Sequence, residues 1–350
     1  MHVAVDLACA QADAGHDVVF ASAGTSFEQV LRRHGVQVVD LPFAGSPKDA
    51  APTVRALWAL CRAFRPDLIH AHMMSSALLA YPICKIRRIP LVTTMHNSFD
   101  KHSFLMRLGT VVVAVSGAER ELLLSRGYPP HKVVTIINGP VDSPREEPVD
   151  NPPTLLKPSV ITLSGLHPRK AVNDVITAFA GVAPGNPDWH LNIVGSGPQR
   201  DELEAQARGM DLDGRIHFLG ASANPRQLLE QAEIFATATL ADPCPLTIME
   251  ARAAGCAIVG TEVGGIPETL DGGAAGLLVP AKDPTAMAEA LQRLMGSPEL
   301  RSALQRRALD GAGYYRVQRM AQDHLVLYRS LLRPRKTSDE GAPAMHPRHG

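Results

Sequence analysis

Residues 242–268 read DPCPLTIMEARAAGCAIVGTEVGGIPE, and this stretch decides the fold of the chain. Two prolines stiffen its start, and the apolar run from Leu246 to Met249 then predicts a helix that ends at Gly255. The short apolar run 257–260 that follows predicts a buried strand. A loop, a helix and a strand in this order are typical of an α/β fold.

The same stretch has the features of an anion-binding site. The first amides of the predicted helix, at Leu246 and Thr247, have no acceptor inside the helix and lie at the positive end of its dipole. Glu250 lies one turn further along, within reach of the hydroxyls of a sugar whose phosphates sit at the helix tip. Taken as an isolated acid pair, Asp242 and Glu250 would be interpreted as a turn-former and a solvated helix residue.

The spacing of these acids resembles the signature of glycosyltransferase family four, which has the GT-B fold. Asp242 and Glu250 are separated by seven residues, and the turn Gly264-Gly-Ile-Pro-Glu268 follows. The family usually has Glu where this chain has Asp242, whose carboxylate reaches about 1.5 Å less far. Because the whole stretch matches, the resemblance favours a functional pair. It implies that Glu250 holds a ribose and that Asp242 orients hydroxyls of the transferred sugar.

Composition excludes several classes of protein. A chain of 350 residues is long enough for two globular domains. The 35 basic and 35 acidic residues balance, so we expect no nucleic-acid partner. Five cysteines without paired or metal-ligand spacing indicate buried thiols in a reducing compartment, although Cys244 lies inside the predicted site and is open to modification there. Neither a membrane span nor a signal peptide is evident, which favours a cytoplasmic location.

Helical periodicity alternates with β-rich runs along the chain, and this predicts parallel sheets flanked by helices. A Pro-rich, acidic linker at 143–158 divides the alternation. We predict two doubly wound, Rossmann-like domains, 1–142 and 159–317, with a cleft between the carboxyl ends of their strands. The expected strands are 18–22, 36–41, 68–70, 91–95, 111–115 and 133–136 in the first domain, and 160–163, 191–194, 216–219, 234–236, 257–260 and 276–279 in the second.

Both ends of the chain carry predictions of their own. Residues 318–332 form a predicted helix that crosses back onto the first domain in GT-B enzymes, and 333–350 have the composition of a disordered tail. Residues 1–14 predict a helix that ends at Gly15, whereas family members begin with a strand and a glycine-rich loop. We therefore expect the first strand of the N-terminal domain to be missing, which would leave backbone groups inside its sheet unpaired.

Two further motifs follow predicted strands and resemble family motifs. Lys170 and its neighbour Arg169 lie where the family binds the donor pyrophosphate. Gly165 stands where the family has a phosphate-binding Arg, so we expect Arg169 to supply part of the missing charge. Gly195 and Gly197 resemble a family turn in which the backbone approaches the nucleotide, although tight strand-to-helix turns need glycines as well.

Histidines at two strand ends are the last candidates. His96 follows the predicted strand 91–95, and a His at this position in the family contacts the donor sugar and the reacting centre. His70 and His72 lie at the end of the neighbouring strand, and we interpret them as structural, with rings hydrogen-bonded to loop backbone. Three imidazoles also suggest zinc, but no ligand geometry is evident and the family needs none, so we expect no metal.

The resemblance implies a retaining glycosyltransferase that moves a sugar from a nucleoside-diphosphate sugar to a hydroxyl acceptor in polysaccharide or glycolipid assembly. Lys170, Asp242 and His96 are the catalytic candidates, and no cofactor is expected besides the donor substrate. Basic residues beside apolar ones near Lys85 and Lys101 suggest a lipid-linked acceptor or contact with the inner face of a membrane, although scattered surface cations are common. Two alternatives stay open: a catalytically weak nucleotide-sugar-binding protein and a sugar-nucleotide 2-epimerase.

Overall fold

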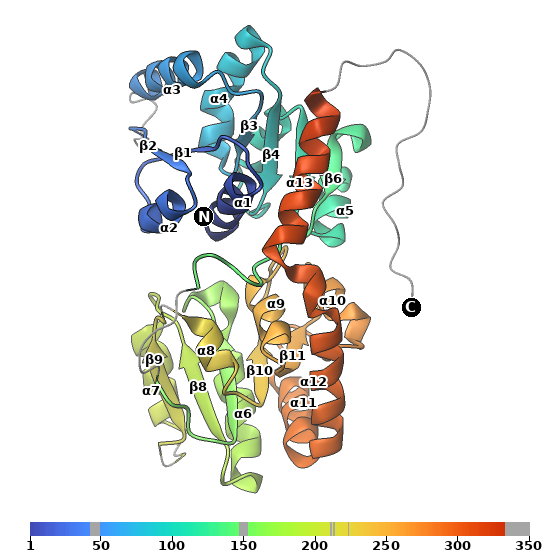
Figure 1. Cartoon of the computed structure of the whole chain (residues 1–350). Coiled ribbons are helices and arrows are strands. Elements are labelled where there is room, and N and C mark those ends of the chain that lie inside the picture. Colours follow the sequence, from blue (N-terminus) through green and yellow to red (C-terminus); the bar gives the residue numbers. More distant parts are fainter. Residues whose placement is uncertain (43–49, 147–152, 211, 213, 223, 333–350) are drawn as a thin grey trace.

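The computed structural model describes residues 1–42, 50–146, 153–210, 212, 214–222 and 224–332, and Figure 1 shows them as two domains, one above the other. Every strand begins and ends within one residue of its expected bounds. The strands are β1 (Val19–Ser22), β2 (Gln37–Asp40), β3 (Ile69–Ala71), β4 (Leu91–Met95), β5 (Val111–Ala114), β6 (Val133–Thr135), β7 (Ser159–Leu163), β8 (His190–Val194), β9 (Ile216–Gly220), β10 (Ile234–Thr237), β11 (Ala257–Thr261) and β12 (Leu277–Val279).

The C-terminal domain is built on one parallel sheet in the order β12-β11-β10-β7-β8-β9. From β7 the chain adds β8 and β9 on one side and then β10, β11 and β12 on the other. Ligands of such sheets bind beside this switch point, at the carboxyl ends of the strands. Fully buried side chains such as Phe179 and Phe235 fill the space between sheet and helices. The helices are α6 (Val172–Val182), α7 (Arg200–Arg208), α8 (Pro225–Leu229), α9 (Leu246–Ala253), α10 (Ile266–Thr269), α11 (Pro284–Gly296) and α12 (Pro298–Ala312).

The N-terminal domain has two parallel sheets instead of one. β1 pairs with β2, and β3 to β6 form a separate sheet in chain order. Among the described residues no strand pairs with both β1 and β3, and the missing first strand stays a prediction. The helices are α1 (His2–Asp13), α2 (Glu28–Arg33), α3 (Ala50–Phe64), α4 (Met74–Arg87) and α5 (Gly117–Ser125), with a 3-10 helix η2 (Ser103–Leu108).

Helix α13 (Val317–Leu332) returns to the N-terminal domain, beside whose strands it runs in Figure 1. Its residues Val317 and Met320 belong to a buried cluster with Leu7 of α1 and Val113 of β5. Burial of this apolar face holds the helix in place, since each fully buried side chain of this size contributes roughly 1.5–3 kcal/mol. The predicted tail at 333–350 lies outside the described residues.

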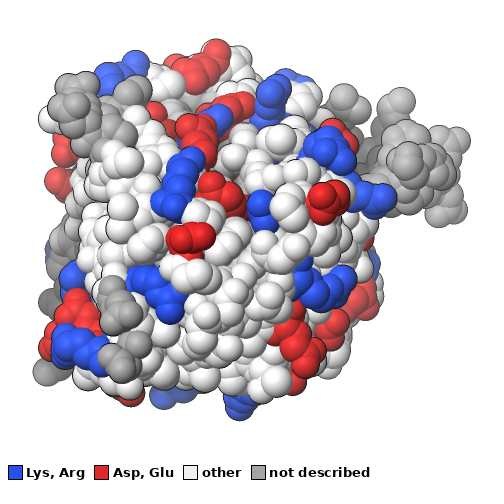
Figure 2. Space-filling model, turned by 90° about the horizontal axis from the view of Figure 1, so that it is seen from below, with Lys and Arg blue, Asp and Glu red and all other residues white. Residues whose placement is uncertain are grey.

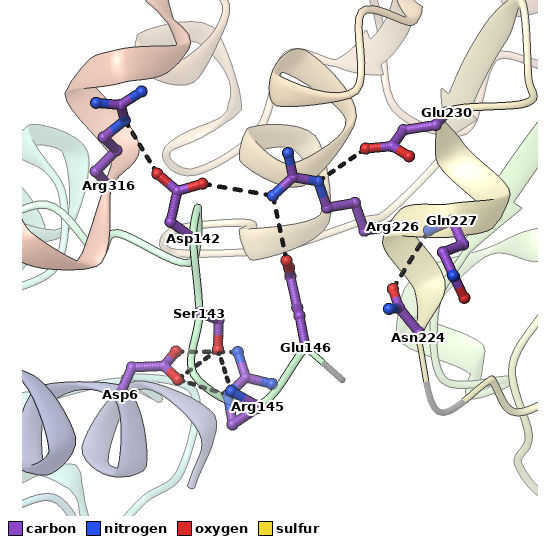
Figure 3. Close-up of polar contacts among 10 residues, drawn as sticks. All are labelled: Asp6, Asp142, Ser143, Arg145, Glu146, Asn224, Arg226, Gln227, Glu230 and Arg316. Atoms are coloured by element: carbon purple, nitrogen blue, oxygen red, sulfur yellow. Dashed lines mark hydrogen bonds and ion pairs between the residues drawn. The ribbon is translucent and has the colours of Figure 1, made fainter. Parts of the chain in front are cut away.

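The chain between the domains is fixed by polar contacts in both directions. Figure 3 shows that Arg145 points toward α1, where its Nε and Nη2 donate to the buried carboxylate of Asp6 at 2.7 and 2.9 Å. Glu146 points the other way, toward Arg226 of α8 at 3.4 Å. Arg226 also reaches Asp142, which pairs with Arg316 at 3.1 Å. This short segment therefore ties α1, α8 and the start of α13 to one another.

Charge is mixed on the end of the C-terminal domain that lies farthest from the N-terminal domain. Figure 2 shows basic and acidic side chains side by side on this face, separated by uncharged ones. No helix among the described residues combines the length and the apolar character that a bilayer span requires.

Candidate active site

The carboxyl ends of β7 and β10 bring Lys170 and Asp242 together. Lys170 Nζ donates to Asp242 Oδ2 at 2.6 Å, and the two side chains are 21% and 13% exposed. Two predicted site residues from motifs more than seventy positions apart thus form one ion pair. A cation with one acceptor and remaining donors can still bind a phosphate oxygen.

Glycines hold the Asp242 loop against the turn that follows β11. The carbonyl of Asp242 accepts a hydrogen bond from the amide of Gly265 at 3.0 Å, and its Oδ1 accepts from the amide of Cys244 at 3.2 Å. Gly264 has φ +54°, and a Cβ on it would collide with the backbone of Asp242. The first glycine of the signature pair is therefore required by backbone contact with the acid it accompanies.

Helix α9 begins at Leu246 without a side-chain cap. Among the described residues, no hydrogen-bond acceptor faces the amides of Leu246 and Thr247. The amides at the helix start are therefore available to an anion.

Cys244 lies just before this helix and is buried, and burial raises the pKa of its thiol to about 12. This corrects the expectation that Cys244 is open to modification, because the reactive thiolate is scarce at such a pKa.

The carboxylate of Glu250, on α9, has no hydrogen-bond partner among the described residues. The residue keeps some accessible surface, yet surrounding protein raises its pKa to about 7, chiefly through loss of solvent. Arg145 opposes this shift, while Glu146 and Asp6 add to it. A carboxylate that is poorly solvated and unpaired gains from a ligand that donates hydrogen bonds.

The guanidinium of Arg169 contacts a residue of the N-terminal domain. Its guanidinium donates to the carbonyl of Ala241 and lies 5.7 Å from the ring centroid of Phe99, in the loop that follows β4 of the other domain. A Cβ on Gly165 would lie 3.0 Å from the His167 ring. The predicted role of Arg169 as a phosphate ligand stays a prediction.

Gly195 and Gly197 contact the protein's own backbone. A Cβ on either residue would collide with the loop after β7, at Ser164 and Leu166 respectively. Their lack of side chains is explained by the packing of these two loops, and their part in donor binding stays a prediction.

The three histidines of the N-terminal domain form one cluster. His72 Nδ1 lies 3.0 Å from His96 Nε2, and His70 lies 2.6 Å from both Thr94 Oγ1 and Tyr328 Oη. Their partners are side chains, so the expectation of hydrogen bonds to loop backbone is wrong. No group of three or more metal-ligating side chains is placed to hold an ion within the part of the chain that the structure describes.

Sequence reasoning missed two residues at the domain boundary. Glu268, the last residue of the signature, accepts a hydrogen bond from the amide of Gly117 at the start of α5, at 2.7 Å. Arg145 of the linker lies close enough to Glu250 to influence its pKa. The Glu of the Gly-Gly-Ile-Pro-Glu turn was visible as a signal, whereas nothing in the sequence around Arg145 marks its partner.

Comparison with known families matches both halves of the chain. Residues 2–142 match Glycosyltransferase Family 4, and residues 157–297 match Glycosyl transferases group 1. Together these ranges cover about four fifths of the sequence.

Relatives and solved structures agree with these matches. The chain is 25% identical to N-acetyl-alpha-D-glucosaminyl L-malate synthase of Bacillus anthracis, over 95% of this chain and 94% of that protein. It is 25% identical to D-inositol 3-phosphate glycosyltransferase of Corynebacterium kroppenstedtii, over 85% and 76%.

Its fold resembles a glycosyltransferase of Rickettsia africae, with TM-score 0.81, 18% identity and coverage of 96% and 95%. It also resembles Anabaena HepE in complex with UDP-glucose, with TM-score 0.79, 20% identity and coverage of 94% and 95%. The chain therefore belongs to glycosyltransferase family four and is a transferase enzyme of the GT-B fold.

Proposed function

We propose that this enzyme transfers a sugar from a nucleoside-diphosphate sugar to a hydroxyl acceptor with retention of anomeric configuration. The observation that carries the proposal is the grouping of a cation, free helix amides and an unpaired carboxylate at the carboxyl edge of one sheet. A diphosphate beside Lys170 and the amides of Leu246 and Thr247 would be met by positive charge on two sides. The ribose hydroxyls would then donate to Glu250.

In the reaction, the bond from the anomeric carbon to the diphosphate oxygen breaks. A bond to the acceptor oxygen forms on the same face, and the hydroxyl proton leaves with the diphosphate. Charge builds on the departing oxygens, so fixed donors that already point at them lower the barrier. Lys170 supplies such a donor, and its 2.6 Å contact with Asp242 holds it in place before the donor arrives. Asp242 and His96 would contact hydroxyls of the transferred sugar.

The sharpest test uses UDP-glucose first, because HepE was solved with that molecule, followed by other nucleotide sugars. Release of nucleoside diphosphate and a glycosylated product are measured together, and NMR of the new linkage gives its configuration. We expect product with the configuration of the donor, and unchanged turnover in the presence of EDTA. An inverted product would refute retention, and hydrolysis without transfer to any hydroxyl acceptor would refute the assignment as a transferase.

A nucleotide-sugar-binding protein of low catalytic activity is the second candidate. It is favoured by Gly165, which supplies no cation, and by Arg169, whose guanidinium contacts Ala241 and Phe99. Titration calorimetry with the same donors separates the two: binding without product supports this candidate. Conversion of the donor to its 2-epimer would instead support the epimerase, whose signature the stretch 242–268 does not resemble.

We further propose that the acceptor is lipid-linked and that the enzyme works at the cytoplasmic face of a membrane, in polysaccharide or glycolipid assembly. Exposed apolar side chains on α4 and η2, at Leu78, Ile86 and Phe104, lie near the cations Lys85 and Arg107. Such a mixture suits an anionic bilayer surface. Sedimentation with vesicles of phosphatidylglycerol, but not of phosphatidylcholine, is the expected result; equal recovery in the supernatant with both would refute it.

A further inference from the structure

Two histidines at neighbouring strand ends share a hydrogen bond that no catalytic role has so far used. His72 follows β3 and His96 follows β4, and these parallel strands end at the same edge of their sheet. His72 Nδ1 and His96 Nε2 lie 3.0 Å apart, and the ring planes differ by 18°. Phe99, three residues beyond His96, contacts Arg169 of the other domain. The pair therefore lies on the side of the sheet that faces the C-terminal domain.

Both rings are uncharged at neutral pH. Burial lowers the pKa of His96 to about 3 and that of His72 well below its usual value. A neutral imidazole has one N–H donor and one acceptor nitrogen. Since the shared bond uses one nitrogen of each ring, the two remaining nitrogens must be of opposite kind. One is a donor and the other an acceptor.

The ring of His72 packs against the ring of His70. Its ring centroid lies 4.1 Å from that of His70, and His70 is fixed on both nitrogens by Thr94 and Tyr328 at 2.6 Å. His96 has no second partner among the described residues, so Nδ1 is the nitrogen that it leaves for a ligand. Rotation of the His96 ring would break its bond to His72.

We propose that His72 is a positioning residue for His96: it fixes the orientation in which His96 presents Nδ1 to a hydroxyl of the donor sugar. The inference rests on the proposed function for the identity of that ligand. The fixing of the ring by His72 rests on the 3.0 Å bond alone. Defined orientation of a group that touches the reacting sugar lowers the entropic part of the barrier.

Two substitutions at one position test this. His72→Leu keeps the volume and removes the hydrogen bond, whereas His72→Asn places an amide atom close to where Nδ1 was. We expect kcat to fall roughly tenfold in His72→Leu with donor KM changed less than threefold, and to recover to within about threefold of the original in His72→Asn. An equal loss in both variants, or none in either, would overturn the proposal.

The chain supplies a matched control. His190 and His217 form a second pair at 3.1 Å, at the other end of the C-terminal sheet from Lys170 and Asp242. His217→Leu should leave kcat unchanged. A tenfold loss there would mean that removing any histidine pair slows the enzyme through stability, and would overturn a specific role for His72.

A second readout separates this proposal from the proposed function. Nuclear Overhauser contacts of the His96 ring protons report the orientation of that ring without any substrate. We expect one ring orientation in the unaltered protein and more than one in His72→Leu. More than one orientation already in the unaltered protein would overturn positioning by His72. A single orientation combined with no transfer from any donor would refute the function and leave the positioning role intact.

Discussion

In the C-terminal domain the strands form one hydrogen-bonded sheet, whereas those of the N-terminal domain are divided between a sheet of two and a sheet of four. The larger sheet of the N-terminal domain is covered in part by α13, which arrives from the far end of the chain. Helix α1 of the N-terminal domain is joined to the linker by the ion pair between Asp6 and Arg145. The strands of the C-terminal domain, which carries the signature, thus form a single sheet. The N-terminal domain packs against segments from outside it, namely α13 and the linker.

This contrast predicts that the two halves respond differently to mutation. Each holds one tryptophan, Trp58 in α3 and Trp189 before β8. Variants with one tryptophan replaced by Phe therefore let fluorescence follow each domain separately during denaturant unfolding.

The largest effect is expected at Arg252, a fully buried arginine of α9. It donates to the carbonyls of Ala308 and Thr269 at 3.1 and 2.6 Å and to Asp271 at 2.9 Å. Arg252→Met removes these hydrogen bonds from a buried site, and we expect a loss of about 3–5 kcal/mol in the unfolding free energy reported by Trp189. The exposed Arg208, changed to Met, should cost less than about 0.5 kcal/mol. If Trp58 reports the same loss, the domains unfold as one unit and the contrast fails.

Lys170→Ala is expected to lower kcat by about 100-fold or more. The lost contact strengthens as charge builds on the leaving diphosphate, and such contacts are worth roughly 3 kcal/mol. Steady-state kinetics with saturating donor measure this, and Lys157→Ala, which removes an exposed cation of the linker, is the control. A change below threefold in Lys170→Ala would show that the diphosphate binds elsewhere.

Glu250→Gln should raise the donor KM about tenfold at pH 8, because an ionised acceptor of ribose hydroxyls is replaced by a neutral one. Protonation does the same, so the donor KM of the unaltered enzyme should fall as pH rises through the raised pKa of about 7. In Glu250→Gln the donor KM should not depend on pH in this range.

The same raised pKa predicts that Glu250→Gln, which weakens donor binding, makes the folded protein more stable. An acid whose pKa is higher in the folded chain costs stability once ionised, and the cost is complete above about pH 7. Glu250→Gln should therefore unfold at a higher temperature than the unaltered protein at pH 8, with no gain at pH 4. The exposed Glu289, changed to Gln, should alter neither KM nor the melting temperature. A pH-independent donor KM in the unaltered enzyme would argue against contact between Glu250 and the donor.

The smallest effect is expected at the contact between α13 and the N-terminal domain. Tyr328→Phe removes the hydroxyl that bonds to His70 at 2.6 Å and to Gln11 at 3.3 Å. We expect a loss of about 1–2 kcal/mol in the transition reported by Trp58 and none in that reported by Trp189. Tyr81→Phe, on the same domain, is the control. A loss of stability reported only by Trp189 would contradict the expectation that this contact with α13 stabilises the N-terminal domain.

The sequence predicted the strands well because short apolar runs between turn residues leave few alternatives. It predicted the grouping of Lys170 with Asp242 only through the rule that parallel strands end at one edge. It did not predict that they pair, that Arg169 reaches Phe99, or that His72 binds His96. Those contacts depend on side-chain directions and on how the two domains meet, and neither is encoded in local periodicity.

The carboxylate of Glu268 accepts a hydrogen bond of 2.7 Å from the amide of Gly117, at the positive end of helix α5 in the other domain. Attraction between a charge and a helix end is screened by dissolved ions, over a distance that shrinks from about 10 Å at 0.1 M salt to about 3 Å at 1 M. We therefore expect concentrated salt to weaken this one contact between the two domains.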